Sequence, residues 1–292
     1  MLSDLPDTLC FLNGEFTCVR DARVSVLDRG FIFGDGVYEV LPAYAGRLFR
    51  FEQHMDRLDR SLAETRIPQP FARKRWLEIA RHLMHSLTSS TGAADQLVYI
   101  QITRGVARRD HVMPEGLTPT VFVMTSEMKP PSMAQRADGV PCVTADDFRW
   151  QKAHIKSTSL LGAVFARQIS ADAGAVETIM FRDGWLSEAA SSNFWVVRDG
   201  VVSGPPKDHL VLQGIRYDLI EELCAETGIP FRLRRIPRED VLAADELMLS
   251  SATKEVLPVT LLDDRPVGTG RPGPIYQRLH AAYQGAKTRQ LT

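Results

Sequence analysis

The sequence predicts a mixed α+β fold in two domains. At 292 residues, the chain is long enough for one large or two medium domains, each with a substantial core. Short β-branched runs alternate with stretches that carry an i, i+3, i+7 apolar stripe, which is the pattern of an amphipathic helix. Ser126–Ala137 contains a Lys-Pro-Pro run and lacks periodicity. We therefore expect a small N-terminal domain at 1–125, a linker at 126–135 and a larger C-terminal domain at 136–292.

The expected elements follow from local pattern and turn chemistry. The N-terminal part begins with a hairpin at Phe11–Phe16, because Asn13-Gly14 is a favoured two-residue turn. It continues with strands at Val37–Tyr44 and Arg47–Phe51, helices from Glu52 and over Ala72–Leu87, and strands at Gln96–Thr103 and Thr120–Thr125. The C-terminal part carries expected strands at Val140–Ala145, Glu177–Phe181, Phe194–Val197 and Glu246–Ser250, and helices at Leu161–Ala173, Ile215–Thr227 and Pro274–Gly285.

Composition narrows the classes of function. The net charge is −1, so no global field attracts nucleic acid or an anionic membrane, and neither is an expected partner. The four cysteines are scattered, without a C-x-x-C pair or metal-finger spacing, so we expect no metal site and a reduced, cytoplasmic setting. No apolar stretch approaches the roughly 20 residues of a membrane span. Residues 1–7 carry an early acid and no apolar core, so no signal peptide is expected.

The most informative feature for chemistry is a lysine paired with a distant carboxylate. Lys156 lies in the run His154–Ala163, and Glu188 opens the segment Glu188–Phe194. A neutral lysine amine forms a Schiff base with an aldehyde cofactor. A buried carboxylate keeps a pyridine nitrogen protonated, so that the ring can accept electrons. Each residue alone is also common on a surface, but together they indicate pyridoxal-phosphate chemistry.

Four other segments carry polar or glycine patterns with two interpretations each. The loop Asp28–Val40 has three glycines in seven positions, typical of close backbone approach to a ligand or simply of a tight loop before a strand. Arg57 suits a phosphate dianion, or a surface ion pair. Arg109 and His111 suit a carboxylate, or a solvated charge run. The turns at Gln213–Arg216 and Ser250–Thr253 suit phosphate, or ordinary helix capping.

These motifs together resemble the fold-type IV pyridoxal-phosphate aminotransferases, most similarly the bacterial D-amino-acid aminotransferases. The resemblance is carried by Asp-Arg-Gly-Phe-Ile-Phe-Gly-Asp-Gly-Val-Tyr-Glu-Val at 28–40 and Ile-Lys-Ser-Thr-Ser-Leu-Leu-Gly-Ala-Val at 155–164, and it covers nearly the whole chain. It implies a small N-terminal α/β domain, a larger β-barrel-like C-terminal domain with flanking helices, and a homodimer whose active site lies at the subunit interface.

The resemblance also implies a role for each residue. Lys156 binds the cofactor aldehyde and is the catalytic proton carrier, while Tyr38, Arg109 and His111 bind the substrate, the last two from the partner subunit. The implied cofactor contacts are Glu188 at the pyridine nitrogen; Ser191, Ser192 and Leu212 along the ring; and Arg57, Ile215, Arg216, Ser251 and Ala252 at the phosphate.

The implied reaction moves an amino group from a D-amino acid, such as D-alanine or D-glutamate, to a 2-oxo acid, such as 2-oxoglutarate or pyruvate. The alternatives on the same fold are a branched-chain L-amino-acid aminotransferase, a 4-amino-4-deoxychorismate lyase and an (R)-amine transaminase; a non-enzymatic alternative is a cofactor-binding protein. The chain departs from the family at Arg216-Tyr217, where Thr-Arg is usual, at Ala252 in place of threonine, and at Ala189-Ala190 in place of Gly-Ser. A hydroxyl contact to the phosphate is therefore lost, although backbone donors remain and Arg216 offers a compensating charge.

Overall fold

The computed structural model describes residues 7–289 and 291–292, which divide into two compact units. The first comprises residues 7–129, 155–160 and 291–292; the second comprises 130–154 and 161–289. The N-terminal stretch considered for a signal peptide lies mostly outside the described residues. Among the described residues, no helix has the length and apolar character needed to cross a membrane.

The first unit is built on an antiparallel sheet that has six strands within the described residues, in the order β2-β1-β6-β5-β3-β4. Its strands are β1 (Leu9–Leu12), β2 (Glu15–Cys18), β3 (Gly36–Tyr44), β4 (Arg47–Leu48), β5 (Gln96–Thr103) and β6 (Thr120–Glu127). The Asn13-Gly14 turn joins β1 and β2, with both residues at positive φ as such a turn requires. The long strand β3, next to the edge strand β4, pairs with β5 from Gly36 to Ala43.

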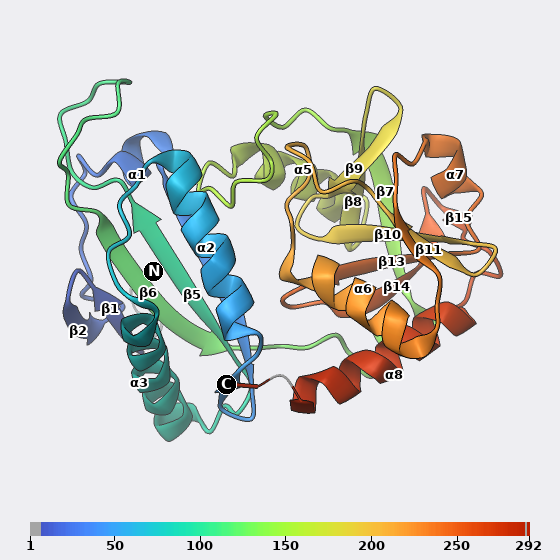
Figure 1. Cartoon of the computed structure of the whole chain (residues 1–292), viewed down its shortest axis with the longest axis horizontal. Helices are drawn as coiled ribbons and strands as arrows, with labels where there is room; N and C mark the ends of the chain where they lie inside the picture. The colour runs from blue at the N-terminus through green and yellow to red at the C-terminus, as the bar shows by residue number, and fades with distance from the viewer. Residues whose placement is uncertain (1–6, 290) are drawn as a thin grey trace. The chain divides into compact units, whose positions relative to one another are not determined.

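The helices of the first unit, among its described residues, are α1 (Arg29–Phe33), α2 (Phe51–Thr65) and α3 (Arg73–Thr91). Helices α2 and α3 pack on one face of the sheet (Figure 1). Their apolar stripes, which include Leu58 and Ile79, meet alternate strand residues such as Ile100 in one core. This packing fixes β3 and α2, which carry the predicted site residues Tyr38 and Arg57.

The second unit contains a mixed sheet, with the described strands in the order β12-β11-β10-β13-β14-β7-β8-β9, and β15 paired with β14. The strands are β7 (Val140–Asp146), β8 (Glu177–Arg182), β9 (Trp185–Ala189), β10 (Asn193–Arg198), β11 (Val201–Gly204), β12 (Phe231–Leu233), β13 (Glu246–Ser251), β14 (Glu255–Leu262) and β15 (Arg265–Pro266). The helices are α4 (Met133–Asp138), α5 (Leu161–Asp172), α6 (Ile215–Thr227), α7 (Arg238–Leu242) and α8 (Pro274–Arg289). Helix α5 packs on β7 and β8, and α6 packs on α8 and β13.

The mixed α+β prediction is confirmed, although the structure contains elements that the sequence did not predict, among them α1, α7, β9 and β14. Three further differences are local. The strand expected to reach Phe51 ends at Leu48, because Arg50 adopts the left-handed conformation and Phe51 begins α2. Helix α4 begins inside the expected linker and continues past its end to Asp138; Ser132 and Gln135 start this helix by exchanging side-chain and backbone hydrogen bonds. Lys156, expected with the C-terminal domain, lies in the first unit, because residues 155–160 pair with β3.

Candidate active site

Lys156 is held against β3 in the first unit. The backbone N–H of Tyr38 donates to the Lys156 carbonyl at 2.9 Å, and Ser157 forms an isolated bridge with Val37. The Lys156 ammonium nitrogen lies 4.2 Å from the centre of the Tyr38 ring. The structure thus brings the predicted Schiff-base lysine and the predicted substrate tyrosine together, both partly exposed.

The glycines of the Asp28–Val40 loop are required by close backbone approach. The Gly34 carbonyl accepts from the hydroxyl groups of Thr158 and Ser159, at 2.8 and 3.0 Å. A side chain at Gly36 would place its Cβ 2.7 Å from the Ile102 carbonyl oxygen. The glycines therefore let the 155–160 segment and β5 approach this loop, which fixes the position of Lys156.

Arg57 forms a buried ion cluster with Glu39 and His54. Its Nε and Nη2 donate to the two carboxylate oxygens of Glu39 at 2.7 and 2.8 Å, and His54 Nδ1 lies 2.8 Å from Oε2. Burial alone would raise the pKa of Glu39, but the Arg57 guanidinium and the His54 hydrogen bond hold that pKa well below its usual range. The predicted phosphate ligand is thus oriented by Glu39, which His54 contacts in turn, and the motif alone revealed neither contact.

Arg109 and His111 lie in an exposed, irregular loop between β5 and β6. Both side chains lie against Phe33 of α1: the Arg109 guanidinium carbon is 5.6 Å from the ring centre, and the His111 ring centre is 5.3 Å away. The structure therefore brings these two predicted carboxylate ligands to one aromatic ring.

In the second unit, Glu188 is buried, and hydrogen bonds to both of its carboxylate oxygens fix its orientation. Its Oε1 accepts from Arg149 at 2.8 Å, while Oε2 accepts from Asn193 Nδ2 at 3.4 Å and from the Leu212 N–H at 3.2 Å. Burial raises the pKa of Glu188 to about 7, and the Arg149 guanidinium limits that rise. A carboxylate accepts about four hydrogen bonds, so these three leave capacity for one further N–H donor, such as a pyridinium nitrogen.

Ser191 and Ser192 meet a charged pair that sequence reasoning missed. Both hydroxyls donate to Oε1 of the buried Glu177, and Lys254 Nζ lies 2.9 Å from the same oxygen. The Lys254 amine is also 3.2 and 3.1 Å from the two serine hydroxyls. Because Lys254 follows the Ser251-Ala252 turn, this cluster ties two predicted cofactor-binding turns together.

The predicted phosphate turn opens α6. Gly214 is its N-cap and contributes no side-chain cap, so the first N–H groups, from Ile215 and Arg216, point out of the helix end. The Arg216 side chain is buried and donates to the Tyr283 hydroxyl at 3.2 Å. The turn thus offers backbone donors to an anion, while the Arg216 guanidinium reaches α8.

Comparison with known proteins places these features in one family. The profile of the amino-transferase class IV family matches residues 36–262. The D-alanine aminotransferase of Bacillus licheniformis is 36% identical over 274 residues, covering 94% of this chain and 95% of the relative. That of Staphylococcus aureus (strain COL) is 36% identical over 275 residues, covering 94% and 96%.

Solved structures agree with this assignment. A fold IV transaminase from Curtobacterium pusillum superposes with a TM-score of 0.80 at 28% identity, covering 91% of this chain and 92% of that one. The branched-chain amino acid aminotransferase of Escherichia coli gives a TM-score of 0.87 at 26% identity, covering 96% and 94%. The resemblance found in the sequence is confirmed: the chain belongs to the class IV aminotransferases, enzymes of fold type IV that depend on pyridoxal phosphate.

Proposed function

We propose that this aminotransferase takes its amino group from a D-amino acid, such as D-alanine or D-glutamate, and passes it to 2-oxoglutarate or pyruvate. The observation that carries the proposal is the Arg109–His111 pair, both of whose side chains contact the Phe33 ring. A guanidinium and an imidazole two residues apart suit a single carboxylate, which Arg binds in a bidentate manner. The D-alanine aminotransferases at 36% identity support the same stereochemistry.

Lys156 is the proposed catalytic residue. Pyridoxal phosphate supplies an electron sink that stabilises negative charge at the substrate Cα. The Lys156 amine takes the proton from the substrate Cα and delivers it to C4′, the carbon that carries the cofactor aldehyde, and it moves the proton from C4′ to Cα in the second half-reaction. The hydrogen bond between the Lys156 carbonyl and the Tyr38 N–H fixes the start of this side chain, so the amine moves over a restricted range.

The remaining predicted residues are proposed to hold the cofactor. Glu188, oriented by Arg149, accepts the pyridine N–H, and the phosphate dianion suits the positive end of α6, where the N–H groups of Ile215 and Arg216 point outward. The Glu188 carboxylate and the uncapped helix end fit a ligand that is cationic at one end and anionic at the other. Further proposed contacts are Ser191, Ser192 and Leu212 at the ring, and Arg57, Ser251 and Ala252 at the phosphate.

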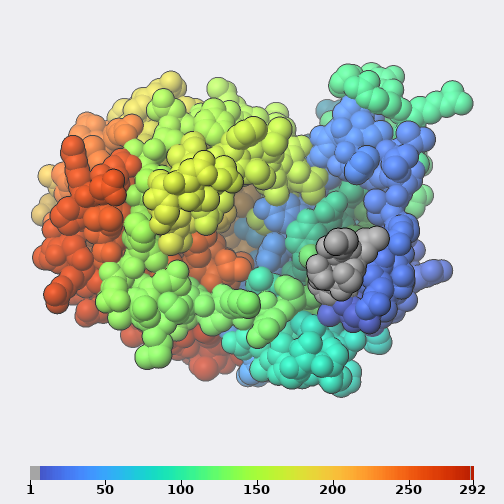
Figure 2. Space-filling view, turned by 180° about the vertical axis from the view of Figure 1, so that it is seen from behind, coloured from blue at the N-terminus to red at the C-terminus, as the bar shows by residue number. Residues whose placement is uncertain are grey.

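A homodimer is proposed because α5 leaves an apolar stripe in solvent. Leu161, Val164 and Phe165 occupy one helical face and are 68%, 59% and 59% exposed. Figure 2 shows this segment, in yellow-green, on the visible face of the second unit. Contiguous exposed apolar surface commonly marks a protein interface.

The dimer is tested by sedimentation of Phe165→Glu, which should be monomeric. The control is Leu242→Glu, at an exposed leucine outside α5, which should stay dimeric. Equal dimer content in the two variants would contradict this assignment.

The proposed donor is tested by half-reactions of the cofactor-loaded enzyme. D- and L-alanine, glutamate and leucine are mixed with it in turn, and the absorbance change of the cofactor is followed. Conversion of the cofactor by D-alanine or D-glutamate is expected. Activity with L-leucine alone would contradict the D assignment and favour a branched-chain enzyme. Conversion of an amine without a carboxylate would instead indicate an (R)-amine transaminase, and pyruvate release without an oxo acid a lyase.

The role of Lys156 is tested by Lys156→Ala, which should lose both conversion of the cofactor and borohydride labelling at position 156.

A further inference from the structure

The loop that carries Arg109 and His111 is joined to α1 by backbone contacts. The Arg29 N–H donates to the Gly105 carbonyl at 2.9 Å, the Ala107 N–H donates to Leu27, and Asp28 forms a bridge with Val106. These contacts fix only the first part of the loop. Residues 109–111 beyond them are exposed and irregular, and such a segment samples many conformations unless side chains restrain it.

Phe33 and Arg29 supply that restraint. The guanidinium groups of Arg29 and Arg109 both lie over the Phe33 ring, with their central carbons 4.8 and 5.6 Å from its centre. The His111 ring is tilted by 42° against the same phenyl group. Arg29 also donates from Nη1 to the carbonyl of Asp110, the residue between the two ligands, at 2.6 Å.

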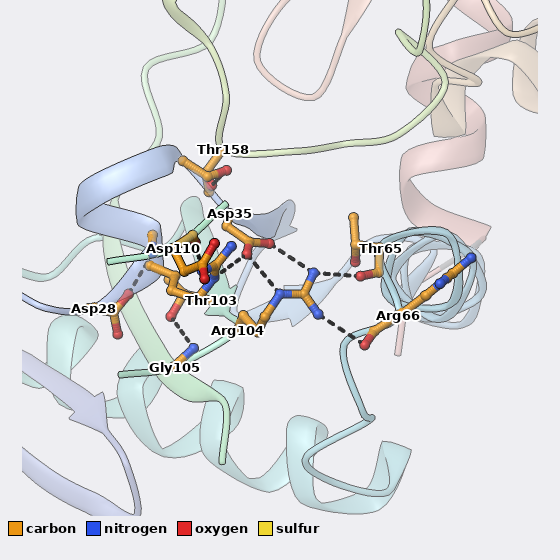
Figure 3. Close-up of polar contacts among 12 residues, drawn as sticks. Asp28, Asp35, Thr65, Arg66, Thr103, Arg104, Gly105, Asp110 and Thr158 are labelled. Atoms are coloured by element: carbon orange, nitrogen blue, oxygen red, sulfur yellow. Dashed lines mark hydrogen bonds and ion pairs between the residues drawn. The ribbon is translucent and has the colours of Figure 1, made fainter. Parts of the chain in front are cut away.

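Arg29 is itself held by a buried charge network. Asp35 Oδ2 accepts from Arg29 Nε and from Arg104 Nε, both at 2.7 Å. Arg104 donates further to the carbonyl groups of Thr65 and Arg66, where α2 ends. Figure 3 shows the Arg104 guanidinium between Asp35 and these two carbonyls, with Asp110 on the other side of Asp35. The loop is thereby connected through Arg29, Asp35 and Arg104 to the C-terminal end of α2.

We propose that Phe33 and Arg29 are positioning residues that hold Arg109 and His111 together, and so determine how tightly the enzyme binds a substrate carboxylate. The inference rests on the proposed function, because it assigns the carboxylate to Arg109 and His111. The Phe33 ring makes two cation–π contacts, with Arg29 and with Arg109. At the strength usual for exposed sites, the loss of both contacts corresponds to a roughly 5- to 30-fold drop in the population of the loop conformation in which Arg109 and His111 are held together.

The test compares Phe33→Leu, which removes the ring, with Phe33→Tyr, which keeps it. Phe33→Leu should raise the KM for the amino acid about 5- to 30-fold with kcat nearly unchanged, because substrate binding is weakened uniformly. Phe33→Tyr should remain close to the wild type. In an Arg109→Gln background, Phe33→Leu should add less than about threefold, since the guanidinium that the ring holds against the carboxylate is gone and only the His111 contact remains.

A second readout does not depend on turnover. Trypsin cleaves after Arg108 and Arg109, so the rate of cleavage there in the cofactor-loaded enzyme reports how often the loop leaves its held conformation. Phe33→Leu should be cleaved several-fold faster than either the wild type or Phe33→Tyr. Equal cleavage rates, together with an effect of Phe33→Leu that persists in Arg109→Gln, would overturn the inference.

The failure of the inference and the failure of the proposed function give different results. If Arg109→Gln alone leaves the KM unchanged, the carboxylate assignment is wrong and the positioning inference falls with it. If Arg109→Gln raises the KM but Phe33→Leu does not, the assignment stands and the positioning role is rejected.

Discussion

Glu39→Gln is the most direct test of the buried charges behind the candidate site. Glu39 has 0% exposure and accepts two hydrogen bonds from Arg57 and one from His54. Glutamine keeps the shape of the side chain but removes its charge, so the positive charge of Arg57 remains buried without its carboxylate. Removing one partner of a buried ion pair costs about 3–5 kcal/mol in the free energy of unfolding. We expect a loss of this size in the cofactor-free protein.

Removing both charges should recover most of this loss. In Glu39→Gln combined with Arg57→Met, no uncompensated charge remains, and replacing both partners of a buried pair by uncharged groups is often close to neutral. The double variant should therefore be more stable than Glu39→Gln alone by about 2 kcal/mol or more. Glu127→Gln, at an exposed glutamate in the same unit, is the control and should change stability by less than about 0.5 kcal/mol.

The pH dependence of this effect has a definite sign. The folded-state pKa of Glu39 is lowered, so its contribution is present above the unfolded value near 4.5 and is lost as the pH falls toward the folded value. In urea titrations followed by circular dichroism, wild type and Glu39→Gln should differ by a constant amount from about pH 6 to 8, and by less below about pH 4. A loss under about 1 kcal/mol at pH 7, or a difference that grows on acidification, would refute the reasoning.

Three further predictions concern the second unit. Gly214→Ala would place a Cβ 1.9 Å from Asn193 Oδ1 and should cost about 1–3 kcal/mol in urea unfolding. Lys254→Met leaves the buried Glu177 without its cation and should cost about 3–5 kcal/mol, most of which Lys254→Arg should restore. Burial raises the pKa of Glu188 from 4.5 to about 7. The stability of the cofactor-free protein should therefore fall by about 3 kcal/mol as the pH rises from 4.5 through 7. In a pH series of melting curves, Glu188→Gln should not show this pH-dependent fall in stability.

The fold was predictable where local pattern and final structure agree. The Asn13-Gly14 turn and the apolar stripe of α2 each follow from a few neighbouring residues. The end of β4 was not predictable, because Arg50 adopts a left-handed conformation that nothing in its own residue type favours. Helix α4 is short and has no buried residue, so no apolar periodicity marks it.

In the candidate site, too, some residues could be predicted from the sequence and others could not. Its predicted residues come from short motifs around Lys156 and Glu188, which a sequence displays directly. Their supporting partners are distant along the chain: Arg149 is 39 positions from Glu188, and Lys254 is 77 positions from Glu177. Such pairs form only when strands come together, so no local pattern identifies them. A buried carboxylate requires a nearby cation, so the sequence predicts that a lysine or arginine lies beside each of these two buried glutamates but does not identify which one.

Arg216 shows how the structure sharpens a departure from the family pattern. The sequence offered its charge as a replacement for a missing hydroxyl, but its guanidinium donates to Tyr283 in α8. If the backbone of the turn carries the phosphate contact, Arg216→Met should lower the stability of the protein by about 1–3 kcal/mol while changing the cofactor dissociation constant by less than about tenfold. Arg216→Thr adds a hydroxyl that can donate to the phosphate, so it should bind the cofactor about 10- to 100-fold more tightly than Arg216→Met. Equilibrium titration of the cofactor-free variants measures both constants. A loss of affinity above 100-fold in both variants would mean that the guanidinium itself binds the phosphate.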